Sequence, residues 1–166
     1  ASCLRTLIEN PGPSYLRLGK VGESSCRPET LPAITDGDWV PIYKGSGNKK
    51  VILVTGTAAQ VVRDWRTFAD KLGDVDIYTV PIWSMHSKNC QKKRFAQYSS
   101  VITFEDHLVD GGFGSYISEI VHSYGIVVDL KVLGLDPKVC GEVGSQDVLM
   151  ELGGVSERAL LDLASQ

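Results

Sequence analysis

The sequence predicts a three-layer α/β domain, in which helices cover both faces of a mostly parallel, five-stranded sheet. Residues 51–55 form a continuous apolar run, as expected for a strand that is covered on both faces. A helical pattern and a second strand follow, and the whole unit has the length of a right-handed βαβ unit, about thirty residues. Residues 100–104, rich in β-branched and aromatic side chains, then lead through a glycine turn into another helix.

Periodicity and end signals predict the other elements of this domain. Apolar side chains at helical spacing indicate a helix over residues 58–72, with Thr57 as its N-cap and Gly73 as its stop. A short alternating pattern predicts an edge strand at residues 39–44. The list is completed by strands at residues 75–82 and 126–133 and by helices at residues 88–98, 115–124, 146–152 and 157–164.

The first part of the chain has no sheet of its own. Residues 3–10 have helical spacing and are followed by a Pro-Gly-Pro stop, and residues 14–18 are predicted to be a strand. Residues 21–38 are rich in Gly, Ser, Pro and Glu, which predicts a linker. An isolated helix and strand before a linker, together with the missing initiator Met, indicate the end of a preceding domain.

Three charged or titratable side chains, Glu105, Asp106 and His107, follow the predicted strand at 100–104. Neighbours on a strand point in alternating directions, so Glu105 and His107 can share one face and act as an acid/base pair. The same residues can instead form a salt-bridged strand end or a domain contact, and we favour this structural interpretation.

Gly111, Gly112 and Gly114 form the turn after these charges. A glycine-led helix start can hold an anion on its free N–H groups. The spacing Gly-Gly-x-Gly is not the dinucleotide fingerprint, because no further glycine follows at the offset that the fingerprint needs, and it is not a P-loop, because no Gly-Lys-Ser/Thr run follows. We therefore favour close packing of the helix on the strand as the reason for these glycines.

Composition excludes several classes of function. The 166 residues carry a formal net charge of −3, which argues against general nucleic-acid binding. No apolar stretch is long enough to span a membrane, and no signal-peptide pattern is visible. The four cysteines, Cys3, Cys26, Cys90 and Cys140, are scattered, so we expect free thiols in the cytoplasm and no metal site.

The run VITFEDHLVDGGFGSYISEIV resembles the C-terminal domain of the transketolase family, in which a strand ending in an acidic pair and His precedes a Gly-Gly-x-Gly-Ser turn. The ending CGEVGSQDVLMELGGVSERAL is similar to the tail of the same domain. The opening PGPSYLRLGK resembles the last strand of the preceding pyrimidine-binding domain. The resemblance implies a mixed sheet with one antiparallel edge strand. It divides the chain into residues 1–20, the linker 21–38, and the C-terminal domain 39–166.

The resemblance also implies a function: transfer of two-carbon ketol units between sugar phosphates by a full-length homodimeric transferase. The full-length enzyme binds thiamine diphosphate and Mg²⁺ through other domains, so we expect neither cofactor nor catalysis in these residues alone. Lys20, or alternatively Arg17, stands where the family contacts the substrate phosphate. A structural role at domain and subunit contacts is expected for the acidic strand end and its turn, namely Glu105, Asp106, His107, Gly111, Gly112 and Gly114.

Two alternatives stay open at this point. The same domain stands at the C-terminus of 1-deoxyxylulose-5-phosphate synthases, and a related domain stands at the C-terminus of the β subunits of 2-oxoacid dehydrogenases. The second of these families usually has Glu-Glu-Gly at the strand end, so His107 favours transketolase modestly. A stand-alone regulatory module that binds an anion at its glycine turn is a different class of function.

Overall fold

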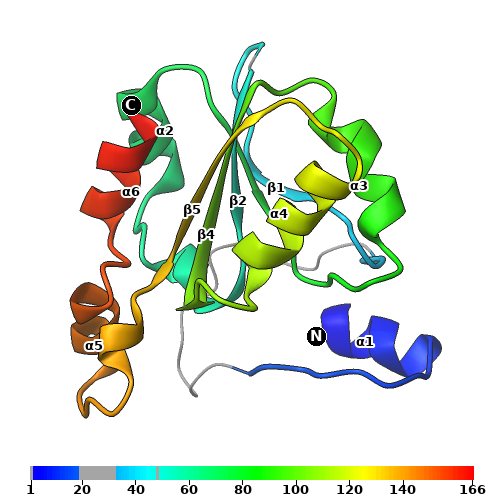
Figure 1. The fold of residues 1–166 in the computed structure, drawn as a ribbon, viewed down its shortest axis with the longest axis horizontal. Coiled ribbons are helices and arrows are strands. Elements are labelled where there is room, and N and C mark those ends of the chain that lie inside the picture. Colours follow the sequence, from blue (N-terminus) through cyan, green and yellow to red (C-terminus); the bar gives the residue numbers. More distant parts are fainter. Residues whose placement is uncertain (1, 19–32, 48) are drawn as a thin grey trace.

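The computed structural model describes residues 2–18, 33–47 and 49–166. In this part of the chain one sheet has the strand order β1-β3-β2-β4-β5 (Figure 1). β1 runs antiparallel to β3 at one edge, and all other neighbouring strands pair in parallel. The predicted five-stranded mixed sheet is therefore confirmed. Its strands are β1 (Val40–Tyr43), β2 (Lys50–Val54), β3 (Asp76–Thr79), β4 (Ser100–Leu108) and β5 (Asp129–Leu135).

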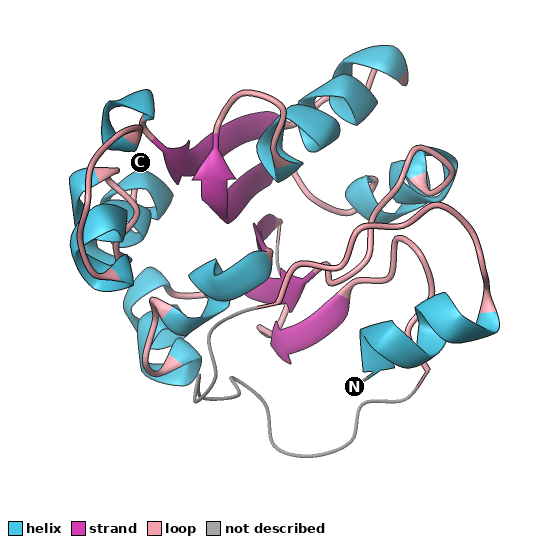
Figure 2. Ribbon diagram, turned by 90° about the horizontal axis from the view of Figure 1, so that it is seen from below, coloured by secondary structure: helices cyan, strands magenta, loops and turns pink. Residues whose placement is uncertain are grey.

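Helices lie on both faces of this sheet, as the two ribbon views show (Figures 1 and 2). On one face Phe68 and Leu160, from α2 and α6, share an apolar core with Ile52 and Ile102 of the central strands. On the other face α3 and α4 enclose a second core. The helices are α1 (Ser2–Glu9), α2 (Trp65–Leu72), α3 (Lys88–Phe95), α4 (Phe113–Ser123), α5 (Gln146–Leu152) and α6 (Glu157–Ala164), with 3₁₀ turns η1 (Gly56–Gln60) and η2 (Pro137–Val139).

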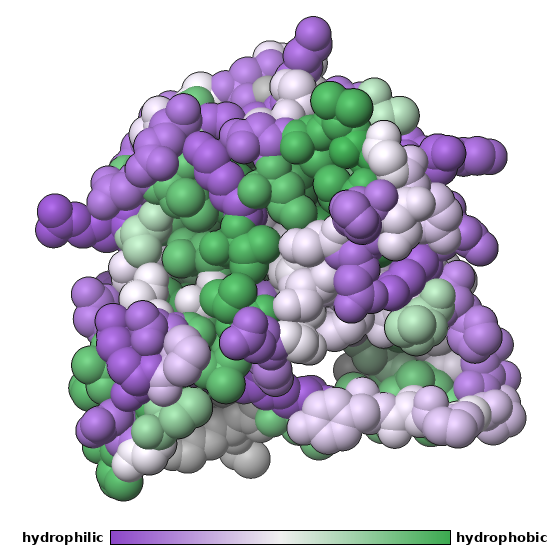
Figure 3. Space-filling view, viewed as in Figure 1, coloured by the Kyte–Doolittle hydropathy of each residue, from purple (hydrophilic) through white to green (hydrophobic). Residues whose placement is uncertain are grey.

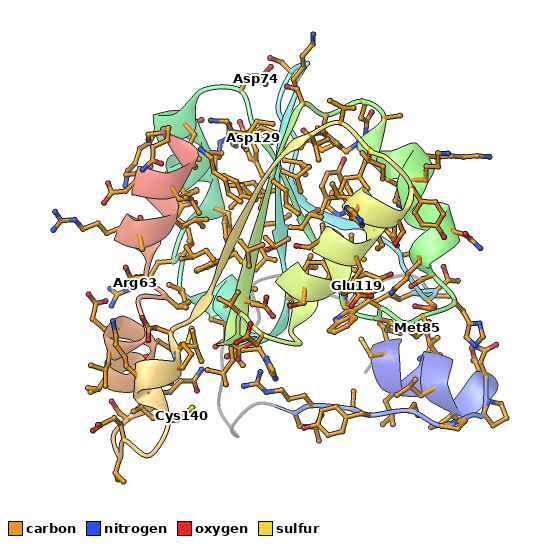
Figure 4. The ribbon with its side chains drawn as sticks, viewed as in Figure 1. Arg63, Asp74, Met85, Glu119, Asp129 and Cys140 are labelled. Atoms are coloured by element: carbon orange, nitrogen blue, oxygen red, sulfur yellow. The ribbon has the colours of Figure 1, made fainter. Side chains whose placement is uncertain are left out.

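The central strands explain the apolar run in the sequence. Residues 51–54 of β2 have no exposed surface, because one set of alternating side chains enters each of the two cores. Asp74 and Asp129 mark the amino-terminal edge of the sheet, and Cys140 lies toward the opposite edge (Figure 4). All four parallel strands end at that opposite edge, which is where the candidate site lies.

β5 is an edge strand of the sheet, and Asp129 and Lys131 alternate along it with apolar neighbours. Most of its residues are half-buried, whereas Asp129 at its start is exposed. Apolar surface gathers over this strand in the space-filling view (Figure 3). The strand begins and ends later than the predicted range of residues 126–133, so that Gly134 and Leu135 belong to it.

Two predictions near the start of the domain are wrong. Residues 14–18 form no strand and are exposed, because none of the strands in the described part of the chain pairs with them. The helix expected over residues 58–72 is divided into η1 and α2, and Asp64 caps α2 by accepting from the backbone N–H groups of Arg66 and Thr67. Thr57 is no N-cap, because it lies in η1, where its hydroxyl bonds to Asp106.

The N-terminal segment lies beyond the carboxyl edge of the sheet (Figure 1). Helix α1 has no buried residue, and residues 10–18 are exposed. No helix in the described part of the chain is long and apolar enough to cross a membrane.

Candidate functional site at the carboxyl end of β4

The acidic residues lie within β4, which extends four residues beyond its predicted end. The register between β4 and β5 is irregular between Phe104 and Leu108, so the pairing changes at the acidic residues. Irregular pairing of this kind redirects side chains at the end of a strand. Gly134 lets β5 lie close to the end of β4, because a Cβ at this position would lie only 2.9 Å from the carbonyl oxygen of His107.

Glu105 turns inward and caps helix α4. Its two carboxylate oxygens accept hydrogen bonds from the backbone N–H groups of Phe113, at 2.6 Å, and Gly114, at 2.7 Å. These N–H groups have no partner within the helix, and the positive end of the helix dipole favours a negative charge beside them. Glu105 is only 1% exposed. The anion at this glycine-led helix start is therefore a side chain of the same domain.

The glycines of the turn are needed for this close approach. A Cβ at Gly112 would overlap the Glu105 carboxylate and lie 2.7 Å from the carbonyl oxygen of Leu108. A Cβ at Gly114 would overlap the Val132 side chain. Gly111 has a φ of +73°, a conformation that other residues rarely adopt. The close-packing interpretation thus fits Gly112 and Gly114, whereas Gly111 is exposed and a Cβ there would meet no atom within 4 Å. Two N–H groups at the helix start are already occupied.

Burial raises the pKa of the Glu105 carboxyl group. The two backbone hydrogen bonds and the nearby His107 oppose this shift, because they favour the charged carboxylate. Loss of hydration outweighs them, and the charged form therefore costs free energy in the folded state.

Asp106 serves the opposite face of β4. Its carboxylate accepts a hydrogen bond from the Thr57 hydroxyl, and its Oδ2 lies 2.9 Å from Nη2 of Arg17. Nη1 of Arg17 also donates to the Asp106 carbonyl oxygen, at 3.3 Å. The side chain of Asp106 is 4% exposed and that of Arg17 is 50% exposed. A Cβ at Gly56 would overlap the Asp106 carboxylate, so this position, with φ +64°, is closed to larger residues.

His107 is exposed and turns back on its own strand. Its Nδ1 lies 2.9 Å from the carbonyl oxygen of Leu108. Both oxygens of Glu105 are meanwhile bonded to the backbone of α4. Glu105 thus caps α4, and the choice between a structural and an acid/base role for Glu105 and His107 stays a prediction.

Sequence reasoning missed two members of this site. Thr57 donates to Asp106, and Nε2 of Gln146, at the start of α5, donates to the Thr57 hydroxyl at 2.9 Å. These contacts span 49 and 89 residues of the chain, and no local pattern signals them. Among the predicted phosphate contacts, Arg17 lies in the site and Lys20 falls outside the described residues. No metal-binding group of three or more His, Cys, Asp or Glu residues occurs in the described part.

The strand order and the helices on both faces define the fold of the chain as an α/β domain with a mixed five-stranded sheet. No family model matches the chain. The fold is similar to that of a solved split-gene transketolase, described as an inactive β4 tetramer, with a TM-score of 0.73 and 18% identity over 98% of this chain and 51% of that one.

Curated proteins similar in sequence are of the same kind. One subunit of the apulose-4-phosphate transketolase of Actinobacillus succinogenes is 23% identical over 95% of this chain and 50% of its own length. The 1-deoxy-D-xylulose-5-phosphate synthases of Rhodococcus erythropolis and Stenotrophomonas maltophilia are 24% and 26% identical, over 89% and 90% of this chain. The chain spans 23% of each synthase. The resemblance to the transketolase C-terminal domain is thereby confirmed, for a chain that spans half or less of these relatives.

Proposed function

We propose that this chain forms the C-terminal, structural part of a thiamine-diphosphate-dependent enzyme that transfers two-carbon ketol units between sugar phosphates. The supporting observation is the match of nearly the whole chain, in sequence and in fold, to about half of transketolase-type proteins. The acidic strand end adds physical support, because its carboxylates hold structural elements in place and contact no reactive group among the described residues. Thiamine diphosphate and Mg²⁺ belong, in this proposal, to other parts of the enzyme.

The strand-end residues divide into two roles in this proposal. Asp106 and His107 support contacts with the preceding domain or with a second subunit of a homodimer, together with the exposed Gly111. Glu105, Gly112 and Gly114 support the same edge indirectly, from inside the domain, because all three are buried. Residues 1–20 form the tail of the pyrimidine-binding domain, residues 21–38 the linker and residues 39–166 the C-terminal domain of a cytoplasmic enzyme.

A substrate phosphate is the proposed ligand of Arg17 or Lys20. Two N–H donors of Arg17 are engaged with Asp106, and half of its side chain is exposed. A guanidinium group has five N–H donors, so the exposed ones are available to an anion without loss of the contact with Asp106.

Calorimetric titration with thiamine diphosphate and Mg²⁺ tests whether cofactor binding belongs to other parts of the enzyme. We expect no heat of binding for this chain alone, and saturable binding with ketol transfer for the full-length enzyme. Binding by the chain alone would overturn the proposal.

In the full-length enzyme, His107→Ala should leave turnover within a few-fold of that of a matched exposed variant on α4, His122→Ala. A loss of several orders of magnitude at unchanged stability would show that His107 is catalytic.

A 1-deoxy-D-xylulose-5-phosphate synthase is the second candidate, because two of the three similar curated proteins carry that name. Analysis of the products made by the full-length enzyme separates the two candidates. Exchange of two-carbon units among sugar phosphates supports the first proposal, whereas formation of 1-deoxy-D-xylulose 5-phosphate supports the second.

A further inference from the structure

The N-terminal segment crosses the carboxyl edge of the sheet with little apolar contact. We name residues 11–18 the strap; all of them are exposed, and α1 before them buries no residue. The space-filling view shows open space between the strap and the body of the domain over part of its length (Figure 3). Leu16, at 37% exposure, is the most covered apolar side chain of the strap, whereas Tyr15 and Leu18 are 88% and 78% exposed, so hydrophobic burial holds the strap only in part.

Among the described residues, the polar contact that joins the strap to the body is an ion pair with two hydrogen-bond acceptors on one residue. Arg17 bonds to both the carboxylate and the carbonyl oxygen of Asp106, so two acceptors on one residue orient its guanidinium group. A further contact lies at α1, where the Thr6 hydroxyl donates to the carbonyl oxygen of Ile34 at 2.6 Å. Thr6 lies in α1, before the Pro-Gly-Pro turn, so its hydrogen bond to Ile34 does not fix the position of residues 14–18 of the strap.

The carboxylate of Asp106 is held in a fixed orientation in which it binds the Arg17 guanidinium group. Its side chain is almost fully buried at the end of a central strand, and the Thr57 hydroxyl and the absence of a side chain at Gly56 set its orientation. Gln146 in turn holds the Thr57 hydroxyl. A buried carboxylate carries a large desolvation cost unless a cation compensates it. Arg17 supplies that cation from 89 residues away in the chain.

We propose that the Arg17–Asp106 ion pair is an electrostatic latch that fixes the strap across the carboxyl edge of the sheet. The latch joins three separate parts of the chain: the strap, η1 through Thr57, and the start of α5 through Gln146. It is a property of this chain alone, so its test is independent of the proposed enzymatic activity. Since Arg17 is half exposed, salt screens the pair in part and loosens the latch.

Backbone ¹⁵N relaxation of the 166-residue chain tests the latch, with three variants compared with the unaltered protein. We expect order parameters for the amides of residues 14–18 of about 0.85 in the unaltered protein, falling below about 0.6 in Arg17→Ala and in Asp106→Asn. Asp110→Asn is the matched control, because it removes an exposed carboxylate from the same strand end. It should leave the strap rigid, while the amides of the sheet stay rigid in every folded variant.

Two results would overturn the latch. One is a strap that stays rigid in Arg17→Ala, which would show that other contacts hold it. The other is a strap that is already flexible in the unaltered protein. Arg17→Ala decides the matter if Asp106→Asn fails to fold, because Arg17 lies on the exposed strap and outside both cores.

Discussion

Glu105 and Asp106 are neighbours on one strand, yet they serve opposite sides of the molecule. Glu105 points to the α4 face, where both of its oxygens bond to the start of that helix. Asp106 points to the other face, where it meets η1 and a cation from the N-terminal segment. The two carboxylates are similarly buried, at 1% and 5% exposure, and they differ in what compensates their charge.

The two carboxylates also differ in how far along the chain their partners lie. The partners of Glu105 are eight and nine residues away, in the element that follows the strand. The cation partner of Asp106 is 89 residues away, in a segment that has no core of its own. Disturbing Glu105 should therefore affect the stability of the domain, whereas disturbing Asp106 or its partners should mostly affect how separate segments are held together.

The largest effect is expected from Glu105→Ala. The substitution leaves two buried N–H groups at the start of α4 without an acceptor, and each costs about 1–3 kcal/mol. We expect the free energy of unfolding to fall by about 3–5 kcal/mol in urea denaturation. Glu119→Ala is the control, because that side chain is 61% exposed on the same helix and makes only a surface ion pair with Lys88 (Figure 4). Equal losses in the two variants would contradict the capping role of Glu105.

A smaller loss is expected from Gly112→Ala. The added methyl group would overlap the Glu105 carboxylate and approach the Leu108 carbonyl oxygen to 2.7 Å, so the turn must shift. Overpacking of this kind costs about 1–3 kcal/mol. Gly12→Ala, where a methyl group would meet no atom within 4 Å, should be close to neutral. Thermal unfolding of both variants measures the difference, and an unchanged midpoint for Gly112→Ala would show that the turn has room.

Much of the fold was predictable because its signals are local. Short stretches of sequence signal the two apolar faces of each central strand and the glycine stops of helices. They also signal the helix caps at Ser145 and Ser156. The start of α2 was missed because the chain offers two possible caps, Thr57 and Asp64, and the structure uses Asp64 while Thr57 bonds to Asp106.

The candidate site was predictable in its location and not in its contacts. The charged strand end and its glycine turn identified Glu105, Asp106 and the three glycines as a group. Which carboxylate faces the helix depends on strand register, and β4 changes register at this point. The contacts of Arg17 and Gln146 depend on tertiary packing, which no period of the sequence records.

Thr57→Val sharpens the comparison from the side of Asp106. The substitution keeps the volume of the side chain and removes the hydroxyl that donates to Asp106 and accepts from Gln146. We expect a loss of about 1.5 kcal/mol in the free energy of unfolding, the lower end of the range for a hydrogen bond to a charged group, because the bond is only partly buried. Thr57→Ser keeps the hydroxyl and should retain most of the stability. If the serine and valine variants are equally destabilised, the lost methyl contacts and not the hydroxyl account for the effect.

The smallest effect is the pH dependence that Glu105 confers. Burial raises the pKa of this carboxyl group in the folded state above its ordinary value of 4.5. The folded protein therefore binds the proton more tightly than the unfolded chain, and stability decreases as pH rises from 4.5 through the folded-state pKa. Glu105→Gln cannot titrate, so the stability of the unaltered protein relative to this variant should fall over that interval and level off above it. Urea denaturation of both proteins at a series of pH values measures this difference. A difference that instead increases with pH would show that the two backbone hydrogen bonds outweigh burial, and that the Glu105 charge stabilises the fold as the Asp106 ion pair is inferred to stabilise the strap.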